Sequence, residues 1–387
     1  MAQPSRRSAA KTARLLYAES ERNADMRYFS GMRVPDAFLA FEFRGKRHGV
    51  FSALEFNRAR HEGRFDEVLS LEDLQKATRE TLGDAAKGPA HIVRLLGRQH
   101  GFTQVEVPED FPTGVAFALQ EAGLRVEVVE GAFFPQRALK TAEEAQFIAE
   151  GCAASAAGIR AAEQALRRAS IDERRFLRLD GKRLTSERLR TLVDSACLEK
   201  GAVAFATICA GGDQACDPHC AGSGPLRADA LIIVDVFPQV SKTGYYGDMT
   251  RTFLKGRASE AQKRLVATVA EAQQRVLTTL KAGISGKRAH EAAAQYFVDE
   301  GYQTGQADGV YSGFFHGTGH GLGLDVHEAP RVSSRVADKL RRGMVVTVEP
   351  GLYYPGLGGC RIEDVVQIER DGCRKLSKAP YRWHLRR

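Results

Sequence analysis

The sequence predicts an α/β fold of two domains, because runs with strand and helix periodicity alternate along most of its length. Such alternation is typical of sheets whose neighbouring strands are connected by helices. A chain of 387 residues is long enough for two domains, or for one large domain with an appendage. Its composition, 43% hydrophobic and 27% charged, is that of a globular protein with an apolar core.

The first third of the chain predicts a small α/β unit. Its short apolar runs alternate with polar residues in the period of a strand, and its helices end at Gly101 and Gly123. In chain order we expect strands at 37–45 and 46–54 that pair as a hairpin, a helix at 92–101, a strand at 103–109, a helix at 111–123 and a strand at 124–131.

A domain boundary is predicted near residues 133–141, where Pro135 and a cluster of basic residues interrupt the pattern. We therefore expect an N-terminal α/β domain at 1–137 and a second domain at 138–387. The second domain is expected to begin with an alanine-rich helix, continue with a basic segment that forms an exposed loop or a helix pair, and add three further helices. These segments are, in order, 142–166, 168–190, 186–201, 259–282 and 286–300.

The net charge of +8 does not predict a nucleic-acid partner, because the basic residues gather at the two chain ends. The first 14 residues carry four basic and no acidic side chains, and the last 18 carry seven basic against one acidic. A nucleic-acid footprint needs a basic face on the fold itself. We expect no secretory signal and no apolar run that spans a bilayer, and the seven scattered cysteines suit reduced thiols. We expect a cytoplasmic protein with no nucleic-acid and no membrane partner.

An acidic residue interrupts an apolar strand at residues 231–237 (LIIVDVF). Counting by twos places Asp235 on the same face as Leu231 and Ile233. A carboxylate on an apolar strand face costs several kcal/mol unless it is paired or binds a metal ion. We therefore expect the Asp235 carboxylate to be paired or to bind a metal ion.

The same pattern recurs three times farther along the chain. Asp248 begins a β-rich stretch, and Glu349 ends the run VVTVE. Glu363 lies in RIEDVVQI, on the predicted strand face that also holds Arg361 and Val365. Each acid taken alone has an ordinary structural explanation, such as a turn or a surface ion pair. Four acids at strand positions in one region together predict a bound cation.

The segment HGTGHGLGLDVHE at 316–328 adds three histidines, His316, His320 and His327. Its glycines disfavour a regular helix, so it is not a helical HExxH zinc site. A glycine-rich backbone also lets a metal or substrate approach closely. One imidazole with four carboxylates suits Mn²⁺, Co²⁺ or Zn²⁺, and carboxylates can bridge two ions.

Five segments, in this order, resemble the metal-ligand motifs of the creatinase, aminopeptidase P and prolidase family. They are the Asp235 strand, GYYGDMTRTF, HGTGHGLGLDVHE, TVEPGLYY and RIEDVV. The resemblance is specific over 205–369 and looser over 140–204, and in the first 135 residues it depends mainly on MRYFSG at 26–31. It implies a pita-bread catalytic domain preceded by a smaller creatinase-type N-terminal α/β domain.

This resemblance implies a dinuclear metallopeptidase, of the aminopeptidase P or prolidase type, that hydrolyses Xaa-Pro bonds. Two divalent ions are expected, Mn²⁺ with Co²⁺ or Zn²⁺ as alternatives. Asp248 and Glu363 would bridge them, and a hydroxide between the ions would be the nucleophile. The implied metal ligands are Asp235, Asp248, His320, Glu349 and Glu363.

Further roles follow from the same resemblance. Glu349 would carry a proton from the water to the leaving nitrogen. His219, His316 and His327 would contact the substrate and stabilise its developing charge. Arg361 would balance the carboxylate charge near Glu363. The implied partners are a peptide with proline at its second position and a second copy of the chain in a homodimer.

The chain departs from the family pattern in the hairpins beside the pocket. Thirteen residues lead from Asp235 to Asp248, which lengthens one hairpin, and the run from Glu349 to Glu363 is short. These changes keep the ligand set but alter the pocket edge, so a pita-bread peptidase of non-proline specificity is an alternative. Two others are a metal-free, creatinase-like amidinohydrolase and a non-catalytic binding module. Retention of all five ligands argues against both, because bare carboxylates gathered in one pocket repel each other.

Overall fold

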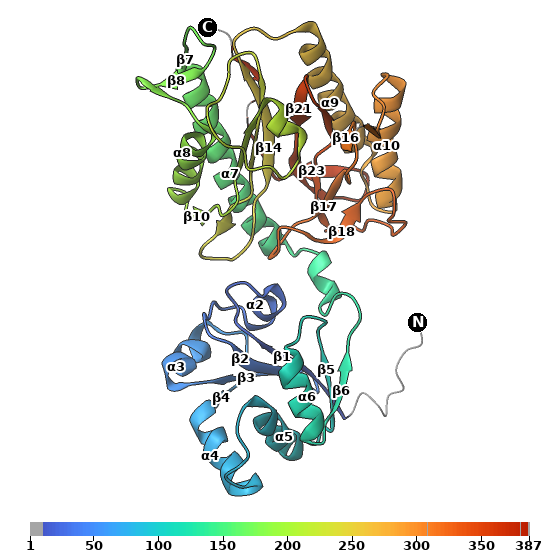
Figure 1. Cartoon of the computed structure of the whole chain (residues 1–387). Helices are drawn as coiled ribbons and strands as arrows, with labels where there is room; N and C mark the ends of the chain where they lie inside the picture. The colour runs from blue at the N-terminus through green and yellow to red at the C-terminus, as the bar shows by residue number, and fades with distance from the viewer. Residues whose placement is uncertain (1–10, 308, 380, 386–387) are drawn as a thin grey trace. The chain divides into compact units, whose positions relative to one another are not determined.

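The computed structural model describes residues 11–307, 309–379 and 381–385 (Figure 1). It divides the chain into two compact units, Met1–Pro135 and Gln136–Arg387. Each unit has hydrophobic clusters of its own, so each is described separately.

The first unit is a mixed six-stranded sheet with helices packed on it (Figure 1). Its strands are β1 Thr12–Ala18, β2 Phe38–Phe43, β3 Lys46–Phe51, β4 Glu67–Ser70, β5 Gln104–Val107 and β6 Arg125–Val128. Its helices are α2 Ala24–Ser30, α3 Ala53–Glu62, α4 Leu71–Leu82, α5 Pro89–His100 and α6 Thr113–Glu121. The strand order is β4-β3-β2-β1-β5-β6, and β2 and β3 form the predicted antiparallel hairpin. The elements predicted for this third of the chain are confirmed.

Two larger sheets form the centre of the second unit. The first, in the order β11-β12-β14-β24, consists of β11 Ile208–Gly211, β12 Leu231–Val236, β14 Met249–Lys255 and β24 His384–Leu385. The second, in the order β18-β17-β19-β22-β23, consists of β17 Gly319–Gly321, β18 Glu328–Val332, β19 Val345–Val348, β22 Asp364–Ile368 and β23 Cys373–Lys375. Smaller pairs are β10 Ala202–Val203 with β13 Gln239–Val240, β15 Gly305–Ala307 with β16 Val310–Ser312, and β20 Gly351–Tyr354 with β21 Gly358–Arg361.

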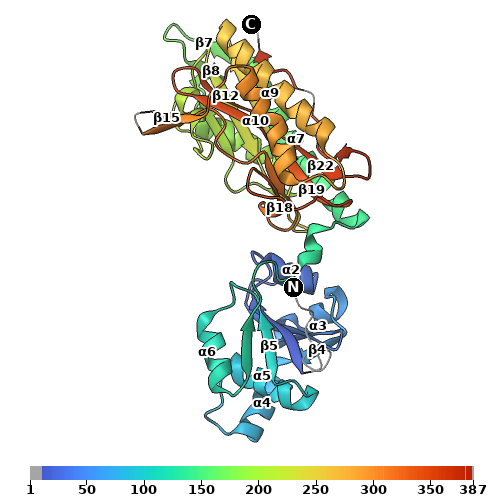
Figure 2. The same cartoon turned by 90° about the vertical axis from the view of Figure 1, so that its right-hand side faces the viewer.

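A pair of helices covers each of these two sheets (Figures 1 and 2). The first pair, α7 Ala142–Arg168 and α8 Ser186–Leu198, shares a hydrophobic cluster with β12 and β14. The second pair, α9 Glu260–Thr279 and α10 Gly286–Asp299, shares a cluster with β19 and β22. Both α7 and α9 begin with a capping box, in which a Thr or Ser side chain and the Glu or Gln three residues later bond each other's backbone. The predicted helices of this unit are confirmed, with small shifts at their ends.

The prediction for the basic segment 168–190 is wrong. This segment contains the small three-stranded sheet of β7 Ser170–Ile171, β8 Leu177–Leu179 and β9 Lys182–Arg183, rather than a loop or a helix pair. Asp180 and Gly181 connect β8 and β9 with φ angles of 50° and 74°. An Asp-Gly pair in this left-handed region is the two-residue turn that suits the twist of a β-hairpin. For this segment, the Asp-Gly turn is a better predictor of the local structure than the high content of basic residues.

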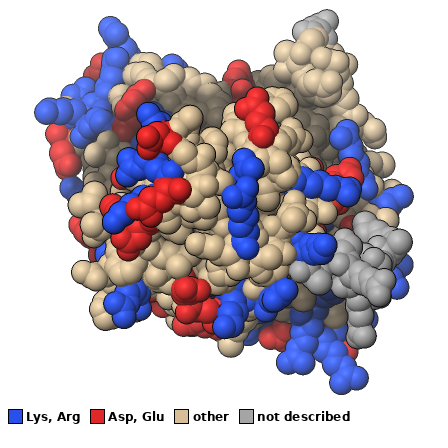
Figure 3. Space-filling model, turned by 90° about the horizontal axis from the view of Figure 1, so that it is seen from below, with Lys and Arg blue, Asp and Glu red and all other residues tan. Residues whose placement is uncertain are grey.

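Charged side chains of both signs are scattered over the face seen in Figure 3. On the part of this face that the described residues form, Lys and Arg are interspersed with Asp and Glu instead of forming one basic patch. Among the described helices, none combines the length and the apolar character that a membrane crossing requires.

A close backbone contact joins α7 to the chain just before β14. A Cβ added to Gly151 would lie 2.4 Å from the backbone nitrogen of Gly247, and one added to Gly247 would lie 1.9 Å from the carbonyl carbon of Gly151. No side chain fits between these backbones. The contact therefore fixes the position of the chain immediately before Asp248.

We expect Gly151→Ala to lower the free energy of unfolding by about 1–3 kcal/mol, because the added methyl group must displace backbone. Gly372→Ala is the matched control in the same unit, since a Cβ there meets nothing within 4 Å. Its stability should stay within about 0.5 kcal/mol of the unaltered protein. Denaturant unfolding of the two variants measures the difference, and equal stabilities would contradict the close packing.

Candidate metal centre

A cavity of about 830 Å³ lies in the second unit. All nine residues predicted from the sequence as site residues line it, although they come from segments far apart in the chain. They are His219, Asp235, Asp248, His316, His320, His327, Glu349, Arg361 and Glu363. Large cavities with a few convergent polar groups are the usual form of small-molecule sites.

Two of the acids come from the paired strands β12 and β14. Asp235 is opposite Thr250 in their antiparallel register, and Asp248 directly precedes β14. Both carboxylates are buried, with 8% and 3% of the residue exposed. The strand Asp235 predicted from the sequence is therefore correctly placed, and the Gly151–Gly247 contact supports Asp248 from behind.

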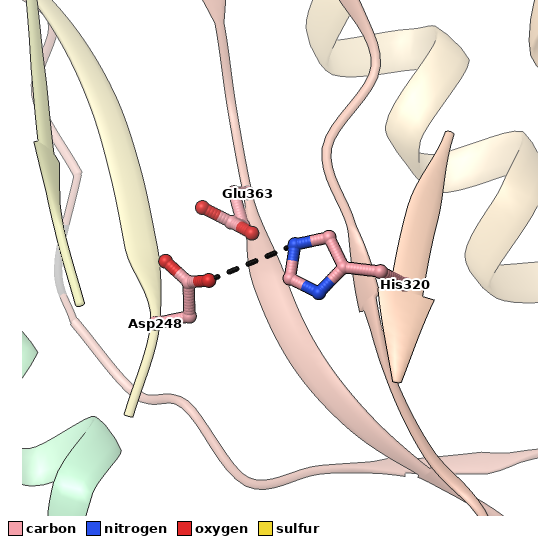
Figure 4. A group of neighbouring side chains, drawn as sticks. All are labelled: Asp248, His320 and Glu363. Atoms are coloured by element: carbon pink, nitrogen blue, oxygen red, sulfur yellow. Dashed lines mark ion pairs between the residues drawn. The ribbon is translucent and has the colours of Figure 1, made fainter. Parts of the chain in front are cut away.

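His320, on strand β17 of the second sheet, lies close to these acids in the cavity. Ligand atoms of Asp248, His320 and Glu363 all lie within 4.8 Å of one another (Figure 4). The Nε2 atom of His320 is 3.8 Å from Oδ2 of Asp248 and 3.2 Å from Oε1 of Glu349. Its backbone N–H donates to Thr347 Oγ1 at 3.0 Å, which connects this part of β17 to the neighbouring strand β19.

Glu349 and Glu363 lie just outside the strand ladders. Glu349 follows the last residue of β19, and its N–H donates to the carbonyl of Thr318 at 2.8 Å. The prediction that Glu363 lies on a strand face is wrong, because β21 ends at Arg361 and β22 begins at Asp364. This break lets the Glu363 side chain turn into the cavity. Thr250 supports Glu363 twice, by accepting its N–H at 3.1 Å and by donating its hydroxyl to Oε2 at 2.8 Å.

Arg361 is a buried cation at the wall of the cavity. Its guanidinium donates to Asp235 Oδ2 at 2.8 Å, to the Tyr353 hydroxyl at 3.0 Å and to the carbonyl of Pro218 at 3.3 Å. The sequence predicted that Arg361 balances charge near Glu363; the carboxylate with which it pairs is Asp235. A guanidinium bonded on several sides holds a carboxylate in a fixed orientation.

The buried carboxylates strongly perturb each other's ionisation. Burial raises the pKa of Asp248 well above its ordinary value, and the charges of Glu363 and Asp235 raise it further. Burial, followed by the charges of Glu349 and Asp235, raises the pKa of Glu363 to about 8. Burial also raises the pKa of Glu349, but its contact with His320 outweighs burial and lowers the pKa to about 2. Protein groups alone leave this cluster short of positive charge.

These residues fit a divalent metal centre. Oδ1 of Asp235 is buried and has no hydrogen-bond partner among the described residues. A buried carboxylate oxygen without a partner is costly unless a cation binds it. Four carboxylates and one imidazole are also a ligand set that Mn²⁺, Co²⁺ or Zn²⁺ accepts.

The three remaining histidines surround the cluster. The rings of His320 and His327 meet edge to face, with centroids 4.3 Å apart. Nε2 of His316 lies 2.9 Å from the Tyr353 hydroxyl. Burial lowers the pKa of both His316 and His327 to about 4, so both rings are neutral near pH 7. His219 lines the cavity from a loop and is exposed.

Sequence reasoning missed several residues of the site. Thr250 and Thr347 hold ligands in place, and the buried Tyr353 connects His316 with Arg361. Arg331 also lines the cavity, because it is opposite His320 in the register of β17 and β18. Each threonine lies two residues along the chain from an acidic ligand, and this spacing is a usable signal. Nothing in the sequence marks Arg331.

Comparison with known proteins gives two kinds of match. The model of metallopeptidase family M24 matches residues 146–370, more than half of the chain. An Xaa-Pro dipeptidase of Pyrococcus furiosus is 33% identical over 245 residues, which cover 62% of this chain and 64% of that protein. Xaa-Pro aminopeptidase 1 of Streptomyces coelicolor is 35% identical over 226 residues, covering 51% and 46% of the two chains. The aligned regions thus span about half to two thirds of these relatives.

Solved structures match over nearly the whole length. A prolidase from Pyrococcus furiosus has a TM-score of 0.76 at 24% identity, covering 95% of this chain and 97% of that chain. An X-Pro aminopeptidase from Thermotoga maritima has a TM-score of 0.79 at 23% identity, covering 97% of each. This likeness confirms the predicted α/β fold, in which a pita-bread domain follows a smaller N-terminal domain. With the family model matched across all five predicted ligands, the chain belongs to metallopeptidase family M24.

Proposed function

We propose that this protein is a dinuclear metal-dependent peptidase that hydrolyses Xaa-Pro peptide bonds. The observation that carries the proposal is the convergence of five ligand-type side chains in one cavity, with a buried carboxylate oxygen of Asp235 that has no partner among the described residues. The relatives named Xaa-Pro dipeptidase and Xaa-Pro aminopeptidase support the choice of reaction. The proposed metal ligands are Asp235, Asp248, His320, Glu349 and Glu363.

Two divalent ions bound there, Mn²⁺ with Co²⁺ or Zn²⁺ as alternatives, would polarise a peptide carbonyl and lower the pKa of water. The side chains beside them have separate tasks. Glu349 has a carboxylate held between His320 and the Thr347 hydroxyl, at 3.2 Å from each, so it is oriented to carry a proton to the leaving nitrogen. His219, His316 and His327 line the cavity and can bind the substrate's oxygen atoms.

The remaining cavity wall is suited to a proline side chain. Apolar side chains share the lining with the charged cluster: Ala206, Ile208, Phe237, Phe315 and Val326. A proline ring is apolar and its nitrogen carries no N–H, so an apolar wall receives it without leaving a donor unsatisfied. A wall of this kind is the part of the site that supports proline specificity.

Arg331 extends the proposal to the length of the substrate. It adds a positive charge to the cavity beside His320 and His327. A dipeptide places its C-terminal carboxylate one residue beyond the scissile bond, and a guanidinium is the side chain best suited to bind a carboxylate. We therefore propose a preference for Xaa-Pro dipeptides.

The homodimer and the cytoplasmic location predicted from the sequence stay predictions, as does the domain boundary between residues 137 and 138. Sedimentation velocity of the purified chain tests the first, and cell fractionation tests the second. Expression of residues 138–387 alone tests whether the second domain folds independently.

We expect metal-stripped protein to cleave no Xaa-Pro dipeptide, and added Mn²⁺ or Co²⁺ to restore cleavage. Asp248→Ala should lower kcat/KM by at least about a thousandfold, because it removes a proposed bridging ligand. Asp371→Ala, which alters an exposed acid outside the cavity, is the control and should keep full activity. Metal binding without cleavage before proline would contradict the substrate class, and absence of metal binding would contradict the reaction.

We expect Arg331→Ala to raise KM for an Xaa-Pro dipeptide roughly tenfold or more, because a charge-assisted contact with its carboxylate is lost. The C-terminal amide of the same dipeptide should show little change, since it lacks the negative charge. Arg335→Ala alters an exposed arginine nearby and is the matched control. An equal effect of Arg331→Ala on acid and amide would argue against carboxylate recognition.

A further inference from the structure

A buried glutamine on α9 lies directly behind the candidate metal centre. Gln273 has 7% of its surface exposed and does not line the cavity. Its Nε2 atom lies 3.1 Å from the carbonyl oxygen of Val348, 3.2 Å from that of Ile362 and 3.3 Å from Oδ2 of Asp364. Because all three neighbours are oxygen atoms that accept hydrogen bonds, this end of the side chain is the NH₂ group.

The two carbonyls that Gln273 binds belong to the residues directly before two proposed ligands. Val348 precedes Glu349, and Ile362 precedes Glu363. One side-chain amide therefore connects two chain segments that are separate in sequence and that both turn a glutamate toward the cavity.

The backbone ladder cannot hold these segments together at this point. The pairing of β19 with β22 ends at Val348 opposite Asp364, and Ile362 and Glu363 lie in the break between β21 and β22. Beyond a ladder's last pair, the separation of two chains must be set by other contacts. The NH₂ group of Gln273 lies at this end of the ladder and donates to a carbonyl on each of the two chain segments, those of Val348 and Ile362.

Asp364 orients the amide. Its carboxylate accepts hydrogen bonds from Arg251, Lys375 and Ser377 as well as from Gln273. Asp364 is buried, with 3% of its surface exposed, and it pairs with both Arg251 and Lys375 at 2.8 Å. A buried anion of this kind holds the NH₂ group, and not the amide oxygen, toward the two carbonyls.

We propose that Gln273 is a positioning residue for the metal centre, which holds Glu349 and Glu363 at the spacing that bound ions require. This inference rests on the proposed function, since it needs a metal at the cavity. Helix α9, which packs against β19, β20 and β21, thus takes part in the site through one side chain. Contacts that fix metal ligands from outside commonly contribute ten- to a hundredfold to metal affinity.

The test is Mn²⁺ affinity, measured by calorimetric titration of metal-free protein. Gln273→Met keeps the side-chain volume and removes the donor, so we expect Mn²⁺ to bind roughly ten- to a hundredfold more weakly. Gln262→Met is the matched control. Gln262 is also buried on α9 and also donates to a backbone carbonyl, that of Asp229, but it contacts neither ligand segment. It should retain unaltered Mn²⁺ affinity even if its stability falls.

Two further measurements separate positioning from packing. Thermal unfolding of the metal-free variants shows whether Gln273→Met remains folded, and added Mn²⁺ should raise its Tm less than it raises that of Gln262→Met. Gln273→Ala removes both the hydrogen-bond donor and the side-chain volume, so its comparison with Gln273→Met separates the two effects. If Gln273 only filled space, the methionine variant would keep wild-type affinity while the alanine variant lost it, and that result would overturn the proposal.

The outcomes also separate this inference from the proposed function. Unaltered Mn²⁺ affinity in Gln273→Met would overturn the positioning role alone. Failure of the unaltered protein to bind Mn²⁺, Co²⁺ or Zn²⁺ would overturn the metal centre and the positioning role together. Tight Mn²⁺ binding without Xaa-Pro cleavage would overturn the substrate class, while the Gln273 comparison would still be decided by affinity.

Discussion

Mutual repulsion among buried carboxylates is the constraint on which the second unit depends. Asp235, Asp248, Glu349 and Glu363 share one cavity, and at least two of them have a strongly raised pKa when protein groups alone surround them. Such a cluster persists only if rigid neighbours hold each acid and a cation offsets their charge. The strands, the threonines beside them and Arg361 supply the rigidity, and the family to which the chain belongs implies the divalent cation.

Two buried arginines pair with acidic residues in this cluster and next to it. Arg361 lines the cavity and binds Asp235. Arg251 donates to the backbone carbonyls of Thr250 and Glu363 and pairs with Asp364 at 2.8 Å. Each guanidinium therefore donates hydrogen bonds both to a carboxylate and to a backbone carbonyl. Replacing either by lysine would keep the charge and lose the planar set of donors on which this geometry depends.

Some chemistry-bearing residues can be predicted from the sequence because each breaks a local rule, whereas the roles of His219 and Arg361 follow only from the family resemblance. Asp235 interrupts an apolar strand, and His320 lies in a glycine-rich segment that cannot form a regular helix. Arg331 and Gln273 break no rule. An exposed arginine on a strand and a glutamine on an amphipathic helix are ordinary in sequence, and they gain their roles from register and helix packing. Strand breaks are equally hidden, because RIEDVVQI has the composition of one continuous strand although the structure divides it before Asp364.

The position of the ligands at the ends of strands explains why support from other elements is needed. A residue inside a ladder has its backbone fixed on both sides, but its side chain must point straight up or down from the sheet. Asp248, Glu349 and Glu363 all lie one residue outside a strand, where the side chain can turn toward a shared point. At these positions, however, the backbone has no ladder hydrogen bonds to hold it in place. For Glu349 and Glu363, hydrogen bonds with Thr318, Thr250 and Gln273 replace the missing ladder bonds, so the position of each of these two ligands depends on specific donors or acceptors from neighbouring segments.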